Sequence, residues 1–444
     1  MSGIFIEGGV PLIGAVTASG AKNSASKLIF AAMFSNEDVI LNNVPRIKTI
    51  MDDIEVIESV GGKAEWVGNN TLAVNGSQIN SYEVPLEIGE KYRLAFLLAG
   101  PLIFRFGKAF IPKYKSIDGR IKPVNRFLET WESLGFNIEE DENYIKIIND
   151  GDAKGSTIKF KNVSHTATDN SLLSSVFLPG ESTVINASQD PEVDDLIGFL
   201  CGMGAEISRV ENGDIVIKGT GLFNGTIFEV CSDKTEIAVF ATLAVLTRGN
   251  ISIKNVKRDL VLQFINFLNK IGVRFEFSGD DLRVWRHGED LIPQNIEISS
   301  PPGFIHDWQS LATLILTQAN GESFVHDTVY TDRFDYCLDL NRMGAKIDLV
   351  KPSEAGMVPV ISDDAYSIEE MGEPKTVAKI TGPTKLKGER LTVEDFKNGS
   401  VLVLAALTAE GKSEIIGLEN INYYFEDFVD KLKSLGAKIW EQSD

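Results

Sequence analysis

Cysteine and histidine are scarce in this chain of 444 residues, which contains three cysteines and four histidines. Cys201, Cys231 and Cys337 are far apart and form no CxxC pair. This spacing favours neither a disulfide framework nor a zinc site. The histidines are equally scattered, so we expect no metal ion and no other cofactor.

Long apolar stretches and common nucleotide-binding motifs are also missing. The longest apolar run, residues 94–104, contains glycine and proline and is too short to span a bilayer. The N-terminus lacks the basic region and apolar core of a signal peptide. The motifs GxxxxGK[ST], GxGxxG after a strand, and GxSxG do not occur. The sequence therefore predicts a cytoplasmic protein that is neither a P-loop NTPase, a dinucleotide enzyme nor a serine hydrolase.

Basic residues are fewer than acidic ones, 43 against 63, so the formal net charge is −20 at pH 7. Such a surface repels nucleic acid and anionic membrane, so we expect neither as a partner, and no obligate protein partner is evident. The composition, 43% hydrophobic and 24% charged residues, is typical of a globular protein. The length exceeds that of one ordinary core and predicts at least two domains.

One short pattern occurs six times along the chain: the end of a helix, a glycine, and then a strand with charged positions. A glycine just after a helix adopts the left-handed conformation at little cost, and alternation of apolar and polar residues indicates a half-buried strand. The six copies are SVGGKAEW (59–66), SLGFNIEE (133–140), GMGAEISRV (202–210), KIGVRFEF (270–277), RMGAKIDLV (342–350) and SLGAKIWE (434–441).

A second pattern precedes several copies: an apolar helix rich in small residues, a turn, and a β-rich run, as in residues 236–256 and 401–418. With a period of roughly 70 residues, each unit is larger than a solenoid repeat needs. Six such units predict an α/β protein with two domains of three units each. Residues 351–379 are rich in proline, glycine and acidic side chains, and we interpret them as a surface insertion.

The segment TASGAKNSASKL places Lys22 and Asn23 at the predicted start of a helix. A helix N-terminus carries unpaired N–H groups and partial positive charge, and an added lysine makes a site for phosphate or carboxylate. The alternative is a solvated lysine at a helix start. In either case we expect Lys22 to be exposed.

The segment GFIHDWQSLATL places Asp307 just before an apolar helix. This aspartate is either the N-cap of that helix or a group that accepts a proton from a substrate hydroxyl. Its neighbour His306 is interpreted as structural, since no other histidine is near it in sequence.

A basic segment, RFGKAFIPKYKSIDGRIKPVNRF (105–127), stands out in this acidic chain. Its glycine and prolines predict that much of it is loop. It is either an anion-binding lid, which we place at residues 108–126, or a solvated run of charges.

Taken in order, SGAKNSA, GPLIFRFG, FIHDWQ, RMGAK and KLKSLGAKI, together with the six-fold repeat, resemble the UDP-N-acetylglucosamine 1-carboxyvinyltransferase family of enolpyruvyl transferases. The resemblance covers nearly the whole chain except the insertion. It implies an inside-out α/β barrel in two domains, each of three βαβαββ-like units. One domain would comprise residues 1–20 and 231–444, and the other residues 21–230.

The resemblance also implies a reaction. The enolpyruvyl group of phosphoenolpyruvate would move to the 3-hydroxyl of UDP-N-acetylglucosamine with release of phosphate, the first committed step of peptidoglycan precursor synthesis. Lys22 and Asp307 would be catalytic, with no metal. The residues implied to contact the two substrates are Lys22, Asn23, Arg93, Lys122, Pro123, Val124, Asn125, Arg126, Asn162, Val163, Ser164, His165, Asp307, Val329 and Lys397.

The chain departs from the family pattern in the basic segment. The family cysteine that acts near the methylene carbon is missing, and Asp118 is the nearest replacement. Lys122 and Lys397 stand where the family has arginines. Two other interpretations therefore stay open: a paralogous enolpyruvyl transferase with another nucleotide or sugar acceptor, and a catalytically silent binding or regulatory protein on the same scaffold.

Overall fold

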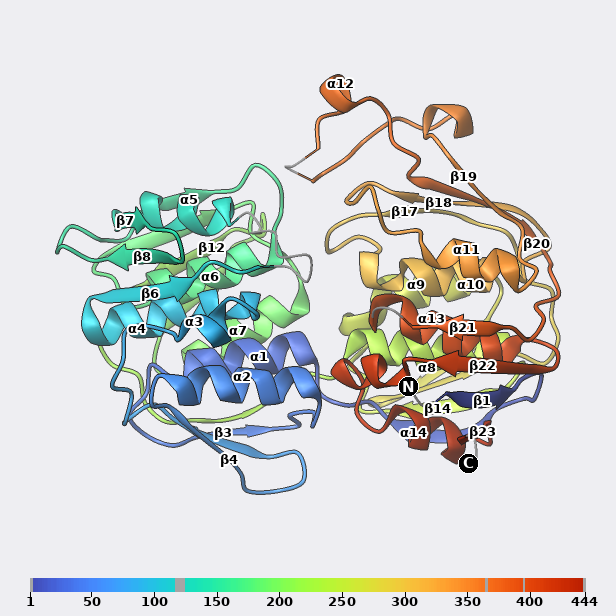
Figure 1. Cartoon of the computed structure of the whole chain (residues 1–444), viewed down its shortest axis with the longest axis horizontal. Helices are drawn as coiled ribbons and strands as arrows, with labels where there is room; N and C mark the ends of the chain where they lie inside the picture. The colour runs from blue at the N-terminus through green and yellow to red at the C-terminus, as the bar shows by residue number, and fades with distance from the viewer. Residues whose placement is uncertain (1–2, 116–123, 364–365, 394–395, 442–444) are drawn as a thin grey trace. The chain divides into compact units, whose positions relative to one another are not determined.

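The structure, a computed structural model, describes residues 3–115, 124–363, 366–393 and 396–441, without the side chains of residues 396–398. The chain divides into two compact units (Figure 1). The first unit comprises Met1–Ser19 and Ser232–Asp444, and the second comprises Gly20–Cys231. Each unit is mixed α/β.

Within the described residues, the first unit has three sheets with one common order: two antiparallel strands, a third strand antiparallel to the second, and a fourth strand parallel to the third. These sheets are β15 (Arg274–Ser278), β16 (Asp281–Trp285), β14 (Asn250–Lys254) and β2 (Ile13–Thr17); β19 (Ile347–Val350), β20 (Val377–Gly382), β18 (Gly321–Asp327) and β17 (Asn295–Ile298); and β23 (Lys438–Glu441), β1 (Ile4–Glu7), β22 (Lys412–Ile416) and β21 (Arg390–Thr392).

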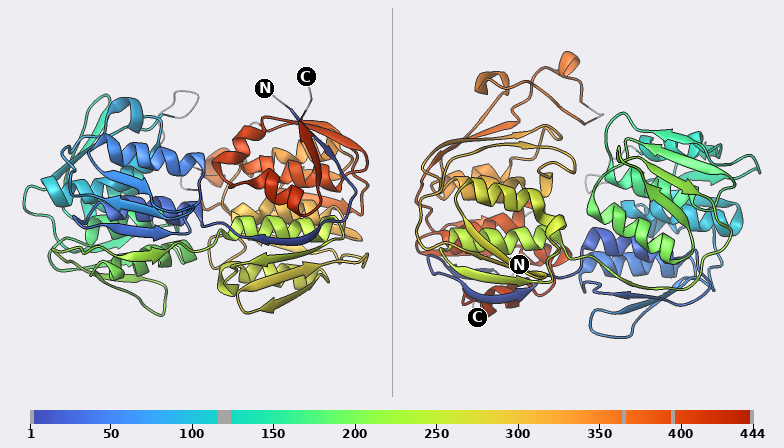
Figure 2. Two further views of the ribbon diagram at one scale, coloured as in Figure 1. Left: turned by 90° about the horizontal axis from the view of Figure 1, so that it is seen from below. Right: turned by 180° about the vertical axis from the view of Figure 1, so that it is seen from behind.

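The N-terminal strand β1 completes a sheet made otherwise of C-terminal strands. Ile6 pairs with Ser413 on one side and with Ile439 on the other, and it is fully buried. In Figure 2 the blue N-terminal strand accordingly lies among the red elements. The two ends of the sequence therefore belong to one folding unit.

The same order recurs in the second unit. Its described sheets are β4 (Lys63–Trp66), β5 (Leu72–Asn75), β3 (Val39–Asn42) and β13 (Ile227–Glu229); β11 (Glu206–Arg209), β12 (Ile215–Lys218), β10 (Glu181–Ile185) and β9 (Thr157–Lys159); and β7 (Asn137–Glu140), β8 (Tyr144–Ile148) and β6 (Lys108–Pro112). The last sheet has three strands, and a parallel bridge from Glu83 to Phe110 takes the position of the fourth.

Buried helices form the core of each unit. In the first unit α8, α10 and α13 pack against one another, and in the second α1 packs on α2 and α7 while α4 packs on α6. The first unit contains α8 (Lys234–Leu246), η2 (Arg258–Val261), α9 (Leu262–Lys270), η3 (His306–Trp308), α10 (Gln309–Leu316), α11 (Tyr336–Arg342), η4 (Ser353–Ala355), α12 (Ile368–Met371), α13 (Phe396–Thr408), η5 (Leu418–Tyr423) and α14 (Phe428–Ser434). The second contains α1 (Lys22–Ala32), α2 (Lys48–Ser59), α3 (Leu86–Gly89), η1 (Arg93–Leu98), α4 (Ala99–Phe106), α5 (Asn125–Ser133), α6 (His165–Ser175) and α7 (Pro191–Gly202).

The repeated glycines adopt the conformation that their position predicts. All six have positive φ, between 84° and 110°, which an L side chain rarely adopts. They follow α2, α5, α7, α9, α11 and α14 and precede β4, β7, β11, β15, β19 and β23, respectively. These glycines are Gly61, Gly135, Gly204, Gly272, Gly344 and Gly436.

The predicted insertion joins β19 to β20 of one sheet. Between these strands the described residues form two short helical segments, η4 and α12, and Val358 and Met371 are exposed. Among the described residues, no helix combines the length and the apolar character needed to cross a bilayer.

Candidate functional site

Lys22 and Asn23 open α1, as the sequence predicts. Ala21 precedes them in an extended conformation, and its N–H donates to the carbonyl of Cys231 at 2.7 Å. The N–H groups of this first turn make a local positive potential suited to an anion. The expectation that Lys22 is exposed was wrong: it is 8% exposed, in a helix that packs against α2, α7 and η1.

Asp53 of α2 is a fully buried carboxylate beside this helix start. Its two oxygens accept hydrogen bonds from the hydroxyls of Ser26 and Tyr92, each at 2.6 Å. Burial raises the pKa of Asp53 to about 7, against the lowering effect of these two bonds and of the positive charge on Lys22. Near neutral pH this group is therefore poised between its two charge states.

A second buried charge lies five residues after Lys22. The ammonium of Lys27 forms an ion pair with Asp169 of α6 at 3.1 Å and also contacts Nε2 of His165. Because an ammonium can only donate, Nε2 of His165 is the acceptor in this contact. Burial raises the pKa of Asp169, and the charge of Lys27 is the largest opposing influence.

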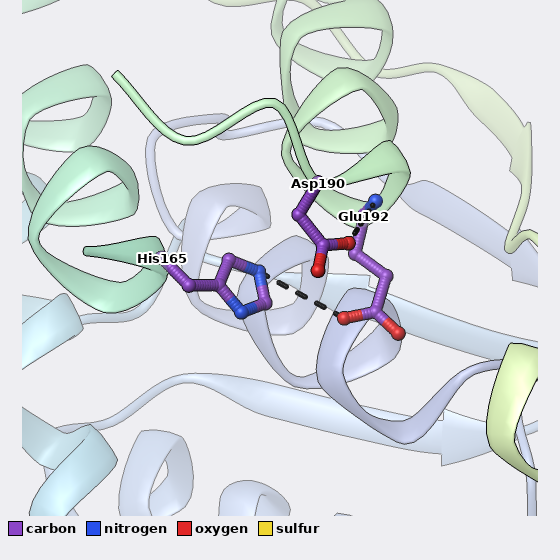
Figure 3. Close-up of side chains that lie close together, drawn as sticks. All are labelled: His165, Asp190 and Glu192. Atoms are coloured by element: carbon purple, nitrogen blue, oxygen red, sulfur yellow. Dashed lines mark hydrogen bonds and ion pairs between the residues drawn. The ribbon is translucent and has the colours of Figure 1, made fainter. Parts of the chain in front are cut away.

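His165 also belongs to a group whose donor atoms lie within 4.8 Å of one another, together with Asp190 and Glu192. Figure 3 shows the three side chains converging at the starts of α6 and α7. Asp190 caps α7 by accepting from the N–H of Glu192 at 3.0 Å. The donor set suits a divalent cation, and the ammonium of Lys27 contacts Nε2 of the same histidine. Lys27 thus supplies the positive charge at this position.

The other predicted contacts of the second unit lie on adjoining elements. Arg93 opens η1, which packs against both α1 and α6. Its guanidinium lies 5.9 Å from the ring centre of Phe127 in α5. Val124, Asn125 and Arg126 are at the start of α5, and Asn162, Val163 and Ser164 precede α6, which Ser164 caps. These predicted residues thus lie at or next to the starts of α1, η1, α5 and α6, where η1 packs against α1 and α6 and where α5 packs against α6.

In the first unit, Asp307 is exposed within η3. The alternative that it caps the apolar helix is wrong, since the residue before η3 is Ile305 and the residue before α10 is Trp308. Burial is the main cause of the raised pKa of the Tyr330 hydroxyl, and the negative charge of Asp307 also raises it. Asp307 therefore acts electrostatically on Tyr330.

Asp327, at the end of β18, links the segment that carries Asp307 to the turn that carries Val329. One of its oxygens accepts from the N–H groups of Val329 and Tyr330, at 2.8 and 2.9 Å. The other accepts from Gln309 at 2.8 Å and faces Nδ1 of His306 at 3.2 Å. The turn that carries Val329 is thereby fixed to the helical segment that carries Asp307.

Part of the basic segment that was predicted to be loop is a strand, β6. Lys108 begins strand β6 and lies 4.0 Å from the ring centre of Tyr82. Lys113 and Lys115 form ion pairs at 2.9 Å, with Glu140 and Glu90 respectively. The predicted residues Asp118, Lys122 and Pro123 lie outside the described residues. Lys397 lies in α13, and its side chain also lies outside the description.

Four buried charged residues near these predicted positions were not predicted from the sequence: Lys27, Asp53 and Asp169 in the second unit, and Asp327 in the first. A signal existed for Lys27, because a lysine within an apolar helix is rarely buried unless it is paired. Its partner Asp169 is far away in the sequence, so the spacing alone did not identify the pair.

Comparison with known proteins adds an independent result. The sequence profile of the family described as EPSP synthase (3-phosphoshikimate 1-carboxyvinyltransferase) matches residues 6–432. The chain is 32% identical to the UDP-N-acetylglucosamine 1-carboxyvinyltransferase of Treponema denticola, across 98% of each chain. It is 30% identical to UDP-N-acetylglucosamine 1-carboxyvinyltransferase 2 of Listeria monocytogenes, across 99% of this chain and 98% of that one.

Solved structures agree in fold. The enolpyruvyl transferase NikO from Streptomyces tendae superposes with a TM-score of 0.85 at 21% identity, over 100% of this chain and 99% of that one. An EPSP synthase from Acinetobacter baumannii gives a TM-score of 0.74 at 16% identity, over the full length of both chains.

Proposed function

This chain belongs to the enolpyruvyl transferase family, and we propose that it transfers the enolpyruvyl group of phosphoenolpyruvate to the 3-hydroxyl of UDP-N-acetylglucosamine, with release of phosphate. This reaction would be the first committed step of peptidoglycan precursor synthesis, in the cytoplasm, and would serve cell-wall formation and with it cell shape and division.

One observation carries the proposal. Relatives with this printed activity match the chain along nearly its whole length. In support, three of the predicted substrate residues, Lys22, His165 and Asp307, lie at or next to the starts of helical segments. Helix starts favour anions, and both proposed substrates carry phosphate.

The chemistry requires cations for phosphate and carboxylate, a base at the acceptor hydroxyl, and an acid at the methylene carbon. Lys22 and Asn23 hold phosphoenolpyruvate at the start of α1, with Arg93 beside them. Asp307 accepts the proton of the sugar hydroxyl as its oxygen attacks. Asp118 is the proposed proton donor to the methylene carbon. Loss of that proton and departure of phosphate then regenerate the enol double bond.

The remaining assignments belong to the same proposal. Residues 122–126 and 162–165, with Val329, line the sugar-nucleotide site, and Lys397 adds an anion contact. Five described four-stranded sheets with one strand order, and a sixth that has three strands of that order, support an inside-out barrel of three repeats per domain. The proposed domains are residues 1–20 with 231–444, which would be the catalytic domain, and residues 21–230, which would carry the basic lid. Each bound lies within one residue of the corresponding compact unit.

The test is phosphate release from phosphoenolpyruvate, measured with UDP-N-acetylglucosamine and with a panel of other UDP-sugars and nucleotides. We expect release only with UDP-N-acetylglucosamine. Asp307→Asn should lose turnover, whereas Asp348→Asn, which changes an exposed aspartate on β19, should keep it. Release with another acceptor alone would identify a paralogous transferase. Tight binding of both substrates without turnover would identify a silent binding protein.

A further inference from the structure

The carboxylate of Asp327 is 0% exposed, yet it is surrounded by hydrogen-bond donors. Two of them are backbone N–H groups, of Val329 and Tyr330, and a third is the side-chain amide of Gln309. The fourth neighbour is Nδ1 of His306, at 3.2 Å. The amide nitrogen of Gln309 can only donate, as can the two backbone groups. Both oxygens of Asp327 are thus committed as acceptors.

This arrangement assigns the histidine tautomer. With an acceptor oxygen facing it, Nδ1 of His306 carries the hydrogen and donates to Asp327. In the neutral ring, Nε2 is then the atom that can take up a proton. An imidazole whose Nδ1–H is held by a buried carboxylate is both fixed in orientation and stabilised when it becomes an imidazolium.

His306 lies next to Asp307, the proposed base, in the same 3₁₀ turn. Its ring lies edge-on to Tyr330, with ring centres 4.9 Å apart, and its side chain is 18% exposed. Asp307 is the next residue in the same 3₁₀ turn, and its charge acts on the same tyrosine. Imidazole is the side chain that most often acts as a general base in enzymes.

We propose that His306, oriented by Asp327, receives the proton of the acceptor hydroxyl through Asp307. This inference rests on the proposed function. As the hydroxyl O–H bond breaks and its oxygen bonds to the enolpyruvyl carbon, the proton passes to the Asp307 carboxylate and then to Nε2 of His306. Asp307 is thereby returned to its ionised form, and Asp327 balances the charge of the imidazolium. Asp327 is a positioning residue in this scheme.

The decisive variant is His306→Asn. The asparagine amide keeps an N–H donor for Asp327 but has no equivalent of Nε2. We expect kcat to fall at least about 100-fold, as general acid–base groups commonly contribute, with KM for both substrates within about three-fold of wild type and an unchanged melting temperature. Added imidazole should restore part of the kcat of His306→Ala. The matched control, His287→Ala, changes an exposed histidine of the same unit and should match wild type.

The two proposals fail in different ways. A wild-type protein that releases no phosphate with any acceptor refutes the proposed function. A wild type that turns over while His306→Asn keeps full kcat refutes only the role of His306, as does a loss in His306→Ala that imidazole does not restore. Nitrogen-15 NMR of the histidines gives a readout that does not depend on activity. We expect the Nδ1–H tautomer for His306 in wild type and its loss in Asp327→Asn, and an Nε2–H tautomer in wild type would overturn the assignment.

Discussion

Asp53 gives a quantitative prediction about stability and pH. It is fully buried among α1, α2 and the residues before α4, and its pKa is raised from 3.8 to about 7, chiefly by burial. Between these two values the folded protein keeps a proton that the unfolded chain releases. The resulting stabilisation is therefore complete below about pH 3.8 and is lost as the pH rises through about 7.

The magnitude follows from the size of the pKa change. At about 1.4 kcal/mol for each pH unit, a rise from 3.8 to about 7 corresponds to roughly 4 kcal/mol. About 3 kcal/mol of this falls between pH 5 and pH 8. Asp53→Asn cannot ionise, and its amide can still bond the hydroxyls of Ser26 and Tyr92. We expect this variant to gain about 3 kcal/mol relative to wild type when the pH is raised from 5 to 8.

Hydrogen exchange of the α1 and α2 amides, corrected for the intrinsic effect of pH, measures the relevant opening free energy. The matched control is Asp52→Asn, which removes the partly exposed partner of Lys48 and should change stability by only about 0.5 kcal/mol at both pH values. Parallel pH profiles for wild type and Asp53→Asn would refute the reasoning, as would a wild type that gains stability relative to the variant.

Four further predictions concern the site. Lys22→Ala should weaken the capture of phosphoenolpyruvate by about 2 kcal/mol, seen as a roughly 30-fold rise in KM; unchanged kinetics would remove its assigned role. Asp307→Asn should abolish turnover, while calorimetry still detects UDP-N-acetylglucosamine binding and the melting temperature stays at the wild-type value; an active variant would contradict this. Lys27→Met should destabilise the second unit by roughly 3–5 kcal/mol, because Asp169 loses its counter-charge, and Lys27→Met/Asp169→Leu should regain most of that loss in urea unfolding. Phosphoenolpyruvate binding should weaken in wild type relative to Asp53→Asn as the pH rises through about 7.

The sequence was informative wherever the signal is local. The six glycines with positive φ, the strands that follow them and the helix start at Lys22 depend on neighbours within a few residues. Each of these could therefore be predicted from spacing and residue type alone.

Burial and pairing depend on distant segments, and here the sequence was less informative. Lys22 was expected to be solvated because a first-turn lysine ordinarily is, but it is buried in the folded chain. Lys27 meets Asp169 across 142 positions, and Asp327 meets His306 across 21. Only the packing of helices and sheets determines such pairs.

The coupling between Asp53 and Lys22 bears on how an acidic chain holds an anionic substrate. When Asp53 is protonated, it adds no negative charge near Lys22, and the start of α1 keeps its full positive potential. When Asp53 ionises, it attracts the ammonium and offsets part of that potential, which is the reciprocal of the lowering effect of Lys22 on the pKa of Asp53. The loss should be about 1 kcal/mol, or roughly five-fold in affinity. The phosphate of the ligand also ionises near pH 6 and acts in the opposite direction, but it does so equally for both proteins. The ratio of the dissociation constants of wild type and Asp53→Asn, measured at pH 6 and pH 8.5, isolates the aspartate. A ratio that does not change with pH would show that Asp53 and the anion site are not coupled.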